Sequence, residues 1–252
     1  MKKSENSIRH LMIRRTLSLF IVALMVSIMT PQAIKAEMLE QILYSGDFHN
    51  CQAVTDVKGI ANQTVVSGII TENENKYLKV SKTGGTAFSC ELLLDTPIRI
   101  GSGDMPSGIA DPGYPGDGAV IEFEYDVKVL PDSDSRIGEI SLRGKRKDNS
   151  TQTVAANFFY GGQSYTGNMS GKKTFTYGKP SEAGTVSIPL DFRGKYISND
   201  VQADTWYKVK VVIPITDTRG NYVTGNNNIN IYLDGKLTEI TNAPCINANC
   251  VL

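Results

Sequence analysis

The sequence predicts an all-β protein whose strands form a two-sheet antiparallel sandwich of the jelly-roll type. Three observations support this fold class. Short β-rich runs recur along the chain, clusters of Gly, Pro, Asn and Asp separate them, and no stretch after residue 36 keeps a helical periodicity. About ten or eleven such runs without an internal repeat favour a single sandwich domain over a repeat architecture.

The first 36 residues differ from the rest and predict a cleaved signal peptide. Basic residues between Lys2 and Arg15 precede the apolar run Leu17–Met29, and Ala36 is small enough for a cleavage site. This run of about 13 residues is shorter than the roughly 20 that a membrane span needs. An uncleaved N-terminal anchor is the alternative. We expect a secreted or cell-surface protein that meets a membrane only through its export signal.

The predicted mature chain, residues 37–252, carries an acidic excess. The whole chain has 26 basic and 26 acidic residues, and the leader holds six of the basic residues and one of the acidic ones. The remaining 20 basic and 25 acidic residues give the predicted mature chain a formal charge of −5. Because nucleic-acid binding needs a basic face, no nucleic-acid partner is expected. The basic cluster from Arg143 to Lys147 is expected at the solvated end of a hairpin. We find no linker and expect one domain over residues 37–252.

The clearest expected strand is Ala119–Leu130, in which polar and apolar residues alternate, so that one face is buried and the other is wet. Asp234-Gly235 predicts a tight hairpin turn, and Gly101–Gly118, rich in Pro and Gly, is expected to be irregular. The other expected strands are Thr64–Thr71, Lys76–Ser81, Ala87–Leu94, Arg136–Arg143, Val154–Tyr160, Thr174–Tyr177, Gly184–Phe192, Trp206–Ile215, Asn228–Leu233 and Lys236–Ile240.

The chain has four cysteines, Cys51, Cys90, Cys245 and Cys250. An even number in an exported chain predicts disulfide bonds, with three connectivities open. The short Pro/Asn loop between Cys245 and Cys250 favours that pair, which leaves Cys51 with Cys90. Zinc ligation is the alternative, although neither spacing is that of a zinc knuckle.

Four segments carry a resemblance to a known family. Thr205–Ile213 (TWYKVKVVI) and Ile229–Lys236 (INIYLDGK) resemble a strand and a hairpin of the concanavalin A-like lectin/glucanase superfamily, most closely its laminin-G-like modules in secreted bacterial surface and polysaccharide-active proteins. Ala119–Leu130 and Lys76–Ser81 are similar to that family's central and early strands. The resemblance covers roughly residues 44–240. It implies a jelly-roll fold and leaves the activity open.

The chain departs from the family pattern at both ends. Asp47-Phe48-His49 stands where such modules often have an Asp-Phe-Glu segment that helps to hold a structural calcium ion. The family's closing strand is either replaced by the cysteine-bearing tail or belongs to a longer chain. A structural calcium ion is the one cofactor left open, because hard oxygen ligands suit Ca²⁺. The candidate loop ligands are Asp104, Asp111, Asp117, Asp132 and Asp134.

No catalytic residue is assigned. Glu122, Glu124 and Asp126 alternate on one strand, but a hydrolase needs a pair of carboxylates about 5–10 Å apart, and the order differs from the E-x-D-x-x-E pattern of laminarinase-type relatives. A lyase needs a base and a group that neutralises a uronate, and that family's R-x-E-x-R and Q-x-H motifs are absent. A polysaccharide lyase or glycoside hydrolase stays open as the alternative function.

Sugar binding requires exposed aromatic rings with amides or carboxylates beside them. Tyr160, Gln163, Tyr165 and Asn168 surround flexible glycines, and Tyr177 lies on the next expected strand. In the alternative interpretation, the aromatic rings fill the core and the glycines only turn the chain. Trp206, the single tryptophan, is expected to pack beneath the sheet edge.

We therefore expect a secreted, non-catalytic module that binds a polysaccharide or cell-surface glycan. Its expected carbohydrate-binding residues are the four side chains around that glycine-rich loop together with Tyr177. A structural surface domain without a small ligand is the second alternative. The sequence indicates neither the glycan nor the oligomeric state.

Overall fold

The computed structural model describes residues 48–57, 60–61, 66–81, 91–92, 94, 97–129, 136–160, 174–178, 195–198, 201–224, 228–246 and 250–252. The chain divides into two units, Met1–Ser45 and Gly46–Leu252, and all described residues belong to the second unit. The predicted signal peptide and the expected strand Gly184–Phe192 lie outside the described residues.

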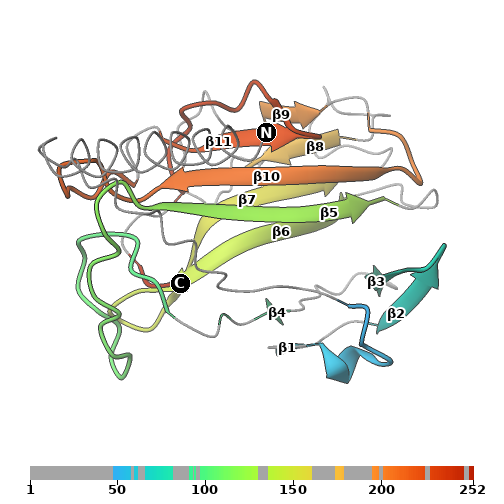
Figure 1. Ribbon diagram of the computed structural model, residues 1–252, viewed down its shortest axis with the longest axis horizontal. Helices are drawn as coiled ribbons and strands as arrows, with labels where there is room; N and C mark the ends of the chain where they lie inside the picture. The colour runs from blue at the N-terminus through green and yellow to red at the C-terminus, as the bar shows by residue number, and fades with distance from the viewer. Residues whose placement is uncertain are drawn as a thin grey trace, which may run out of the picture. The chain divides into compact units, whose positions relative to one another are not determined.

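The described residues form an all-β fold of antiparallel sheets, which confirms the predicted class (Figure 1). Two four-stranded sheets have the orders β12-β11-β10-β5 and β6-β7-β8-β9, and the pairs β1-β4 and β2-β3 form two small sheets. The elements are η1 (Val54–Asp56), β1 (Ile60–Ala61), β2 (Val66–Glu72), β3 (Asn75–Ser81), β4 (Glu91–Leu92), β5 (Val120–Lys128), β6 (Arg136–Lys145), β7 (Thr151–Tyr160), β8 (Thr174–Tyr177), β9 (Lys195–Ser198), β10 (Trp206–Pro214), β11 (Asn230–Leu233) and β12 (Lys236–Leu237).

Strands β5 and β10 are the long pair of the first four-stranded sheet. Their register runs from Trp206 opposite Lys128 to Pro214 opposite Val120. Burial alternates along both strands, as the polar and apolar pattern predicts, because successive side chains of a strand point to opposite faces. The pair therefore has one face in the core and one face in solvent.

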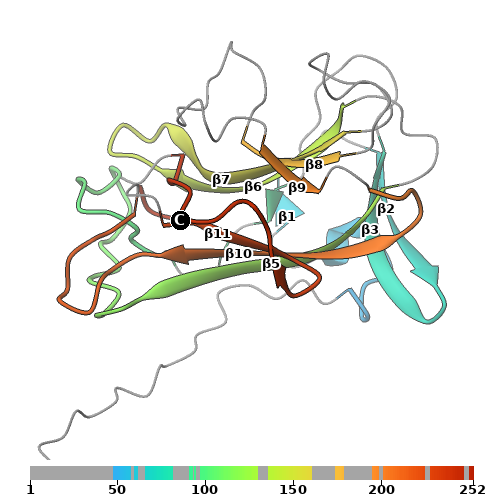
Figure 2. The ribbon, with the colours of Figure 1, turned by 90° about the horizontal axis from the view of Figure 1, so that it is seen from above.

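Figure 2 shows the two four-stranded sheets from above. One cluster of buried side chains takes residues from both sheets. Phe175 of β8 packs edge-on against Tyr207 of β10, with ring centroids 5.3 Å apart. Asn157 of β7 donates a hydrogen bond of 2.7 Å to the hydroxyl oxygen of Tyr125 on β5. Apolar burial of this kind is the main favourable contribution to folding, and here it joins the two sheets through one core.

Two tight turns close hairpins, and the second lies where the sequence predicts a turn. Asn73 and Glu74 between β2 and β3 have φ of 48° and 69°, and Asp234 and Gly235 between β11 and β12 have φ of 49° and 77°. Positive φ at both central residues is the type I′ geometry that matches strand twist. The hairpin predicted at Asp234-Gly235 is confirmed.

The hairpin between β6 and β7 carries the basic cluster. Arg143, Lys145, Arg146 and Lys147 are all exposed there, and the turn closes through Asn149 at a φ of 61°. The predicted solvated hairpin end is confirmed. The long segment Gly101–Gly118 contains neither helix nor strand, as its Pro and Gly content predicts.

The residues Cys250–Leu252 lie beside the end of β6. Val251 forms β-bridges with Arg99 on one side and Lys145 on the other, and it exchanges both backbone hydrogen bonds with Lys145. A Cβ atom on Gly144 would lie 2.6 Å from the Cys250 Sγ and from the Val251 carbonyl oxygen. This segment therefore packs against bare backbone at Gly144.

The expected Cys245–Cys250 disulfide is not formed, whereas the expected Cys51–Cys90 pair includes a cysteine outside the described residues. Cys51, Cys245 and Cys250 are buried, and none of the three forms a disulfide. Burial raises the pKa of the Cys250 thiol to about 12, so the protonated form persists and packs as a small apolar side chain. Cys90 lies outside the described residues.

Strand boundaries differ from the expected ones mainly in the shortest elements. The four-residue strand β9 and the two-residue strand β1 were not expected, because so short a run shows no alternation. Within the expected strand Ala87–Leu94, only Glu91 and Leu92 are described as strand. The β12 strand ends at Leu237, because the Ile231 amide donates to the Ile240 carbonyl oxygen and so leaves the register that pairs Tyr232 with Leu237.

Candidate functional site

The structure describes the predicted sugar-binding residues only in part. Tyr160 is the last residue of β7, but its side chain lies outside the described atoms. Gln163, Tyr165 and Asn168 also lie outside the described residues. Tyr177 is the one predicted side chain whose surroundings are described.

Tyr177 is a core residue. Its side chain has no exposed surface, and its hydroxyl donates a hydrogen bond of 2.6 Å to the Pro244 carbonyl oxygen. Burial raises its pKa far above the usual range, so the phenol stays neutral. The ring therefore has no face that a sugar could reach, and we leave Tyr177 out of the site.

The three carboxylates of β5 face lysines of β10. Lys210 Nζ lies 2.7 Å from the Glu122 carboxylate, and Lys208 Nζ lies 3.0 Å from the Glu124 carboxylate and 4.0 Å from that of Asp126. Hydrogen bonds to these carboxylates raise the pKa of both lysines. Cross-strand charge pairs of this kind are ordinary on the solvent face of an antiparallel sheet.

The described aspartates of the candidate calcium set are engaged separately. Asp104 pairs with Lys147 at 2.7 Å, Asp111 pairs with Arg99 at 2.9 Å, and Asp117 accepts a hydrogen bond of 2.7 Å from Tyr114. Among the described residues, no group of three or more His, Cys, Asp or Glu side chains could hold a metal ion. Asp132 and Asp134 lie outside those residues.

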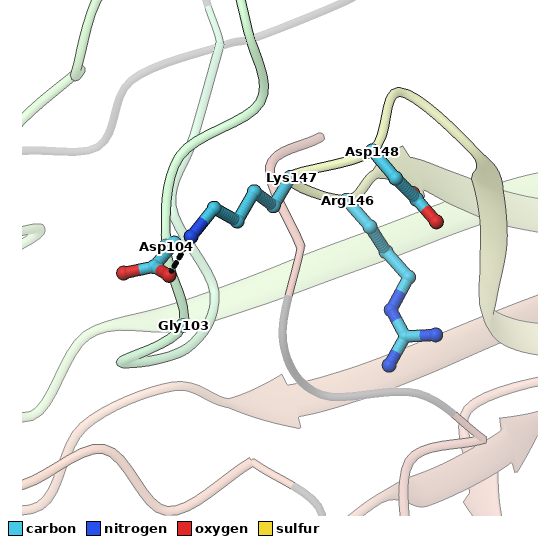
Figure 3. Close-up of a pocket in the computed structure, with 5 residues that line it drawn as sticks. All are labelled: Gly103, Asp104, Arg146, Lys147 and Asp148. Carbon is cyan, nitrogen blue, oxygen red and sulfur yellow. Dashed lines mark hydrogen bonds and ion pairs between the residues drawn. The ribbon is translucent and has the colours of Figure 1, made fainter.

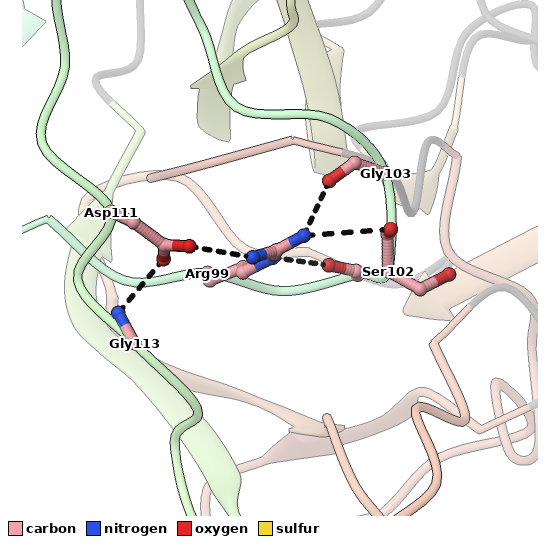
Figure 4. A network of polar contacts seen from close by, with 6 residues as sticks. Arg99, Ser102, Gly103, Asp111 and Gly113 are labelled. Carbon is pink, nitrogen blue, oxygen red and sulfur yellow. Dashed lines mark hydrogen bonds and ion pairs between the residues drawn. The ribbon is translucent and has the colours of Figure 1, made fainter.

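Arg99 fixes the course of the irregular loop that follows it. Its guanidinium donates hydrogen bonds to the carbonyl oxygens of Gly101 (3.0 Å) and Gly103 (2.7 Å) and to the Asp111 carboxylate (2.9 Å) (Figure 4). Asp111 in turn accepts a bond from the Gly113 amide. The loop thereby satisfies backbone groups that no strand pairs.

An open pocket of about 590 Å³ lies between this loop and the β6–β7 hairpin (Figure 3). Two acids and two bases line it beside Gly103, namely Asp104, Asp148, Arg146 and Lys147. The Asp104–Lys147 pair is about three-quarters exposed at both ends, and such pairs contribute little. The balanced charge gives this pocket no preference for an anionic or a cationic ligand.

A second cluster combines an exposed aromatic ring with two carboxylates. The Trp206 cluster consists of Glu72, Tyr77, Lys128, Asp204 and Trp206. The Trp206 side chain is 43% exposed at the start of β10. Its ring stands edge-on to that of Tyr77 in β3, with centroids 5.2 Å apart. The β2–β3 hairpin thus meets one end of the β5–β10 pair.

Lys128 holds the Trp206 cluster together. Its Nζ lies 2.6 Å from the Glu72 carboxylate and 3.2 Å from that of Asp204. It also lies 5.4 Å from the Tyr77 ring centroid and 5.2 Å from that of Trp206, within the range of cation–π attraction. The side chain is only 6% exposed. The hydrogen bond to Glu72 raises the pKa of Lys128 against the opposing effect of burial.

The Trp206 cluster offers the chemistry that a sugar requires. The exposed indole supplies an apolar face, and the side chains of Glu72 and Asp204, 43% and 60% exposed, supply hydrogen-bond acceptors beside it. The edge-on contact and the nearby ammonium group hold the indole in place, so little side-chain entropy remains to be lost on binding.

The prediction that Trp206 packs beneath the sheet edge is wrong. Trp206, Lys208 and Lys210 are alternate residues of β10 and therefore share a face, and the two lysines lie on the solvent face. Strand alternation thus already indicated an outward side chain for Trp206. The role of Lys128 had no comparable indication, because two of its partners, Glu72 and Tyr77, come from a distant hairpin.

Four large hydrophobic side chains are exposed in the described part of the chain, namely Tyr114 (49%), Val120 (46%), Trp206 (43%) and Leu237 (52%). None of the helices described is long and apolar enough to cross a membrane. In comparisons with known proteins, the chain matches no family model, no curated protein and no solved structure.

Proposed function

We propose that this protein is a secreted, non-catalytic module that binds a carbohydrate or another surface polymer. The observation that supports it most is the Trp206 cluster, in which a partly exposed indole is held beside two exposed carboxylates. Sugars present apolar C–H faces and hydroxyl donors, and this arrangement complements both. The predicted export signal places the module where such polymers occur.

The proposal includes the finer fold. We propose that the two four-stranded sheets are the layers of a jelly-roll sandwich, because a single buried cluster takes side chains from both. The segments that resemble concanavalin A-like modules correspond to β3, β5, β10 and the β11–β12 hairpin. In such a sandwich, the outer face of β5 and β10 is available for a ligand.

The state of the β5 carboxylates supports a non-catalytic role. A glycoside hydrolase places one carboxyl group with a raised pKa near a second, ionised one. Here Glu122 and Glu124 lie on the solvent face, about half exposed, within hydrogen-bonding distance of Lys210 and Lys208. Both acids are thus engaged in cross-strand ion pairs with β10, an arrangement that is ordinary on the solvent face of an antiparallel sheet.

The direct test compares two variants that each remove one exposed hydrophobic side chain. Trp206→Ala removes the proposed stacking surface, and Leu237→Ala is the matched control on β12. Retention of the full chain on cellulose, chitin, xylan and polygalacturonate is measured with calcium and with chelator. We expect Trp206→Ala to lose about tenfold or more in affinity for the retained polymer, and Leu237→Ala to match the wild type.

Product release on any retained polymer tests the enzyme alternative in the same assay. New reducing ends or unsaturated uronate absorbance would contradict a non-catalytic role. Complete absence of retention would instead favour a structural surface domain. Tyr160→Ala and Tyr165→Ala test the loop that the sequence favoured, and loss of retention there with full retention by Trp206→Ala would move the site to that loop.

A further inference from the structure

A second exposed aromatic ring is held in place by its neighbours. Tyr114 is 49% exposed, yet its hydroxyl donates a hydrogen bond of 2.7 Å to Asp117, and its ring stands edge-on to Tyr222 with centroids 6.0 Å apart. A Cβ atom on Gly220 would lie 3.2 Å from the Tyr114 hydroxyl and 3.2 Å from the Asp117 carboxylate. The ring is exposed, but its orientation is fixed.

Two loops that carry these residues are tied together. Thr216 accepts a hydrogen bond from the Ala119 amide and donates one to the Gly116 carbonyl oxygen, 2.8 and 2.5 Å long. The Asp217 carbonyl oxygen accepts a hydrogen bond from the Gly118 amide, and the Asp217 carboxylate accepts one from the backbone amide of Asn221. These hydrogen bonds fix both loops and therefore hold Tyr114 in place before a ligand binds. Such preorganisation lowers the entropic cost of binding.

Tyr114 and Trp206 lie at opposite ends of the same strand pair. Trp206 begins β10 opposite Lys128, whereas the Tyr114 loops join the end where Pro214 lies opposite Val120. Eight residue steps separate these ends, which corresponds to about 27 Å at the rise of an antiparallel strand. Figure 1 shows β5 and β10 running side by side over this length.

The charges along this path disfavour a polyanionic ligand. In each of three parts, acidic side chains outnumber basic ones by one, so that a polyanion would be repelled. At the Trp206 end, Glu72 and Asp204 stand against Lys128. Along the strands, Glu122, Glu124 and Asp126 stand against Lys208 and Lys210. At the Tyr114 end, Asp117 and Asp217 stand against Arg219.

We propose that Tyr114 is a second aromatic subsite that acts with Trp206, so that the ligand is an extended polysaccharide without anionic groups lying along β5 and β10. This inference rests on the proposed function and adds the class and the minimum length of the ligand. Two weak contacts on one chain bind together at a high effective concentration. Affinity then depends on the chain spanning both rings.

The test uses the wild type, Trp206→Ala, Tyr114→Ala and the control Leu237→Ala with cellulose, chitin and xylan and with their disaccharides and hexasaccharides. We expect the wild type to bind longer chains at least about tenfold more tightly than disaccharides. Trp206→Ala and Tyr114→Ala should each abolish that advantage, while Leu237→Ala should retain it. Polygalacturonate should not bind.

The outcomes separate this inference from the proposed function. If Trp206→Ala weakens binding while Tyr114→Ala keeps the wild-type affinity and length dependence, the second subsite is wrong and the proposed function stands. If the wild type binds none of the polymers, polygalacturonate included, both are wrong. Tight binding of polygalacturonate would overturn the ligand class.

A footprint of the wild type makes the test independent of any variant. Hydroxyl-radical oxidation of exposed side chains is compared with and without the retained polymer. We expect the polymer to protect Trp206 and Tyr114 together and to leave the oxidation of Leu237 unchanged. Protection of Trp206 alone, with Tyr114 oxidised as in the unliganded protein, would overturn the second subsite.

Discussion

At the scale of single residues, Lys128 determines the arrangement of the Trp206 cluster. Its ammonium group bonds to carboxylates of two segments, Glu72 in β2 and Asp204 before β10, and lies near two aromatic rings. A cation that is only 6% exposed is stable there because hydrogen bonds and ion pairs replace its hydration. The exposed position of the indole therefore depends on a side chain that is itself almost buried.

This arrangement predicts a pH dependence. The pKa of Lys128 is raised above its ordinary value of 10.5, so its ion pairs stabilise the fold fully below about pH 10.5, and this stabilisation is lost as the pH rises through the higher folded-state pKa. Lys128→Met should lower the melting temperature near neutral pH, and the difference from the wild type should shrink at higher pH.

Thermal melting of both proteins between about pH 7 and pH 12 measures this difference. Lys236→Met is the matched control, because Lys236 is an exposed lysine on the β11–β12 hairpin and its replacement should change little at any pH. A difference between Lys128→Met and the wild type that stays constant over this range would show that the charge of Lys128 does not stabilise the fold.

At the scale of elements, the end of β6 is arranged around the absence of a side chain at Gly144. Val251 bridges Arg99 and Lys145 beside this position, and the buried Cys250 thiol contacts the same backbone. Cys250 thus serves packing in the described structure, while the disulfide that the spacing suggested is not formed. A spacing of five residues says only that two cysteines can meet.

Gly144→Ala should displace residues 250–252 from β6. Its Cβ atom would lie 2.6 Å from the Cys250 Sγ and the Val251 carbonyl oxygen, and overpacking of this kind costs about 1–3 kcal/mol. Gly68→Ala in β2, where a Cβ atom meets nothing within 4 Å, is the control. Equal unfolding free energies for the two variants in urea titrations would contradict the tight contact.

Local pattern explains which elements could be predicted. β5 and β8 follow from alternation and turn residues, and the β11–β12 hairpin follows from Asp234-Gly235, because these depend on neighbours in the chain. The Trp206 cluster could not be predicted as a unit. It needs the β2–β3 hairpin to meet the end of β5 and β10, and a contact between distant segments leaves no periodic trace in the sequence.

At the scale of the whole molecule, an all-β scaffold carries exposed aromatic rings at two ends of one strand pair. Rigid strands suit this role because they fix the spacing between contact points better than loops do. The scaffold could be predicted from sequence, and alternation along β10 indicated the outward side chain of Trp206. The contacts of that ring with Tyr77 and Lys128 could not, because they depend on tertiary packing between distant segments.

The first residue of the mature protein tests whether the predicted signal peptide is cleaved during export. We expect the secreted protein to begin at Glu37, because Ala36 fits the small-residue pocket of a signal peptidase. N-terminal sequencing of the exported protein measures this directly, and Ala36→Arg should block processing. Recovery of the wild type only with an intact leader in the membrane fraction would support an uncleaved anchor instead.

The central claim, that Trp206 contacts the ligand, is tested most directly by fluorescence titration of the wild type with a retained polysaccharide. Trp206 is the single tryptophan of the chain, so the indole emission reports on this position alone. The account predicts a saturable change in emission whose midpoint matches the affinity from retention. Full binding of the polymer with unchanged tryptophan emission and no protection of Trp206 would contradict it.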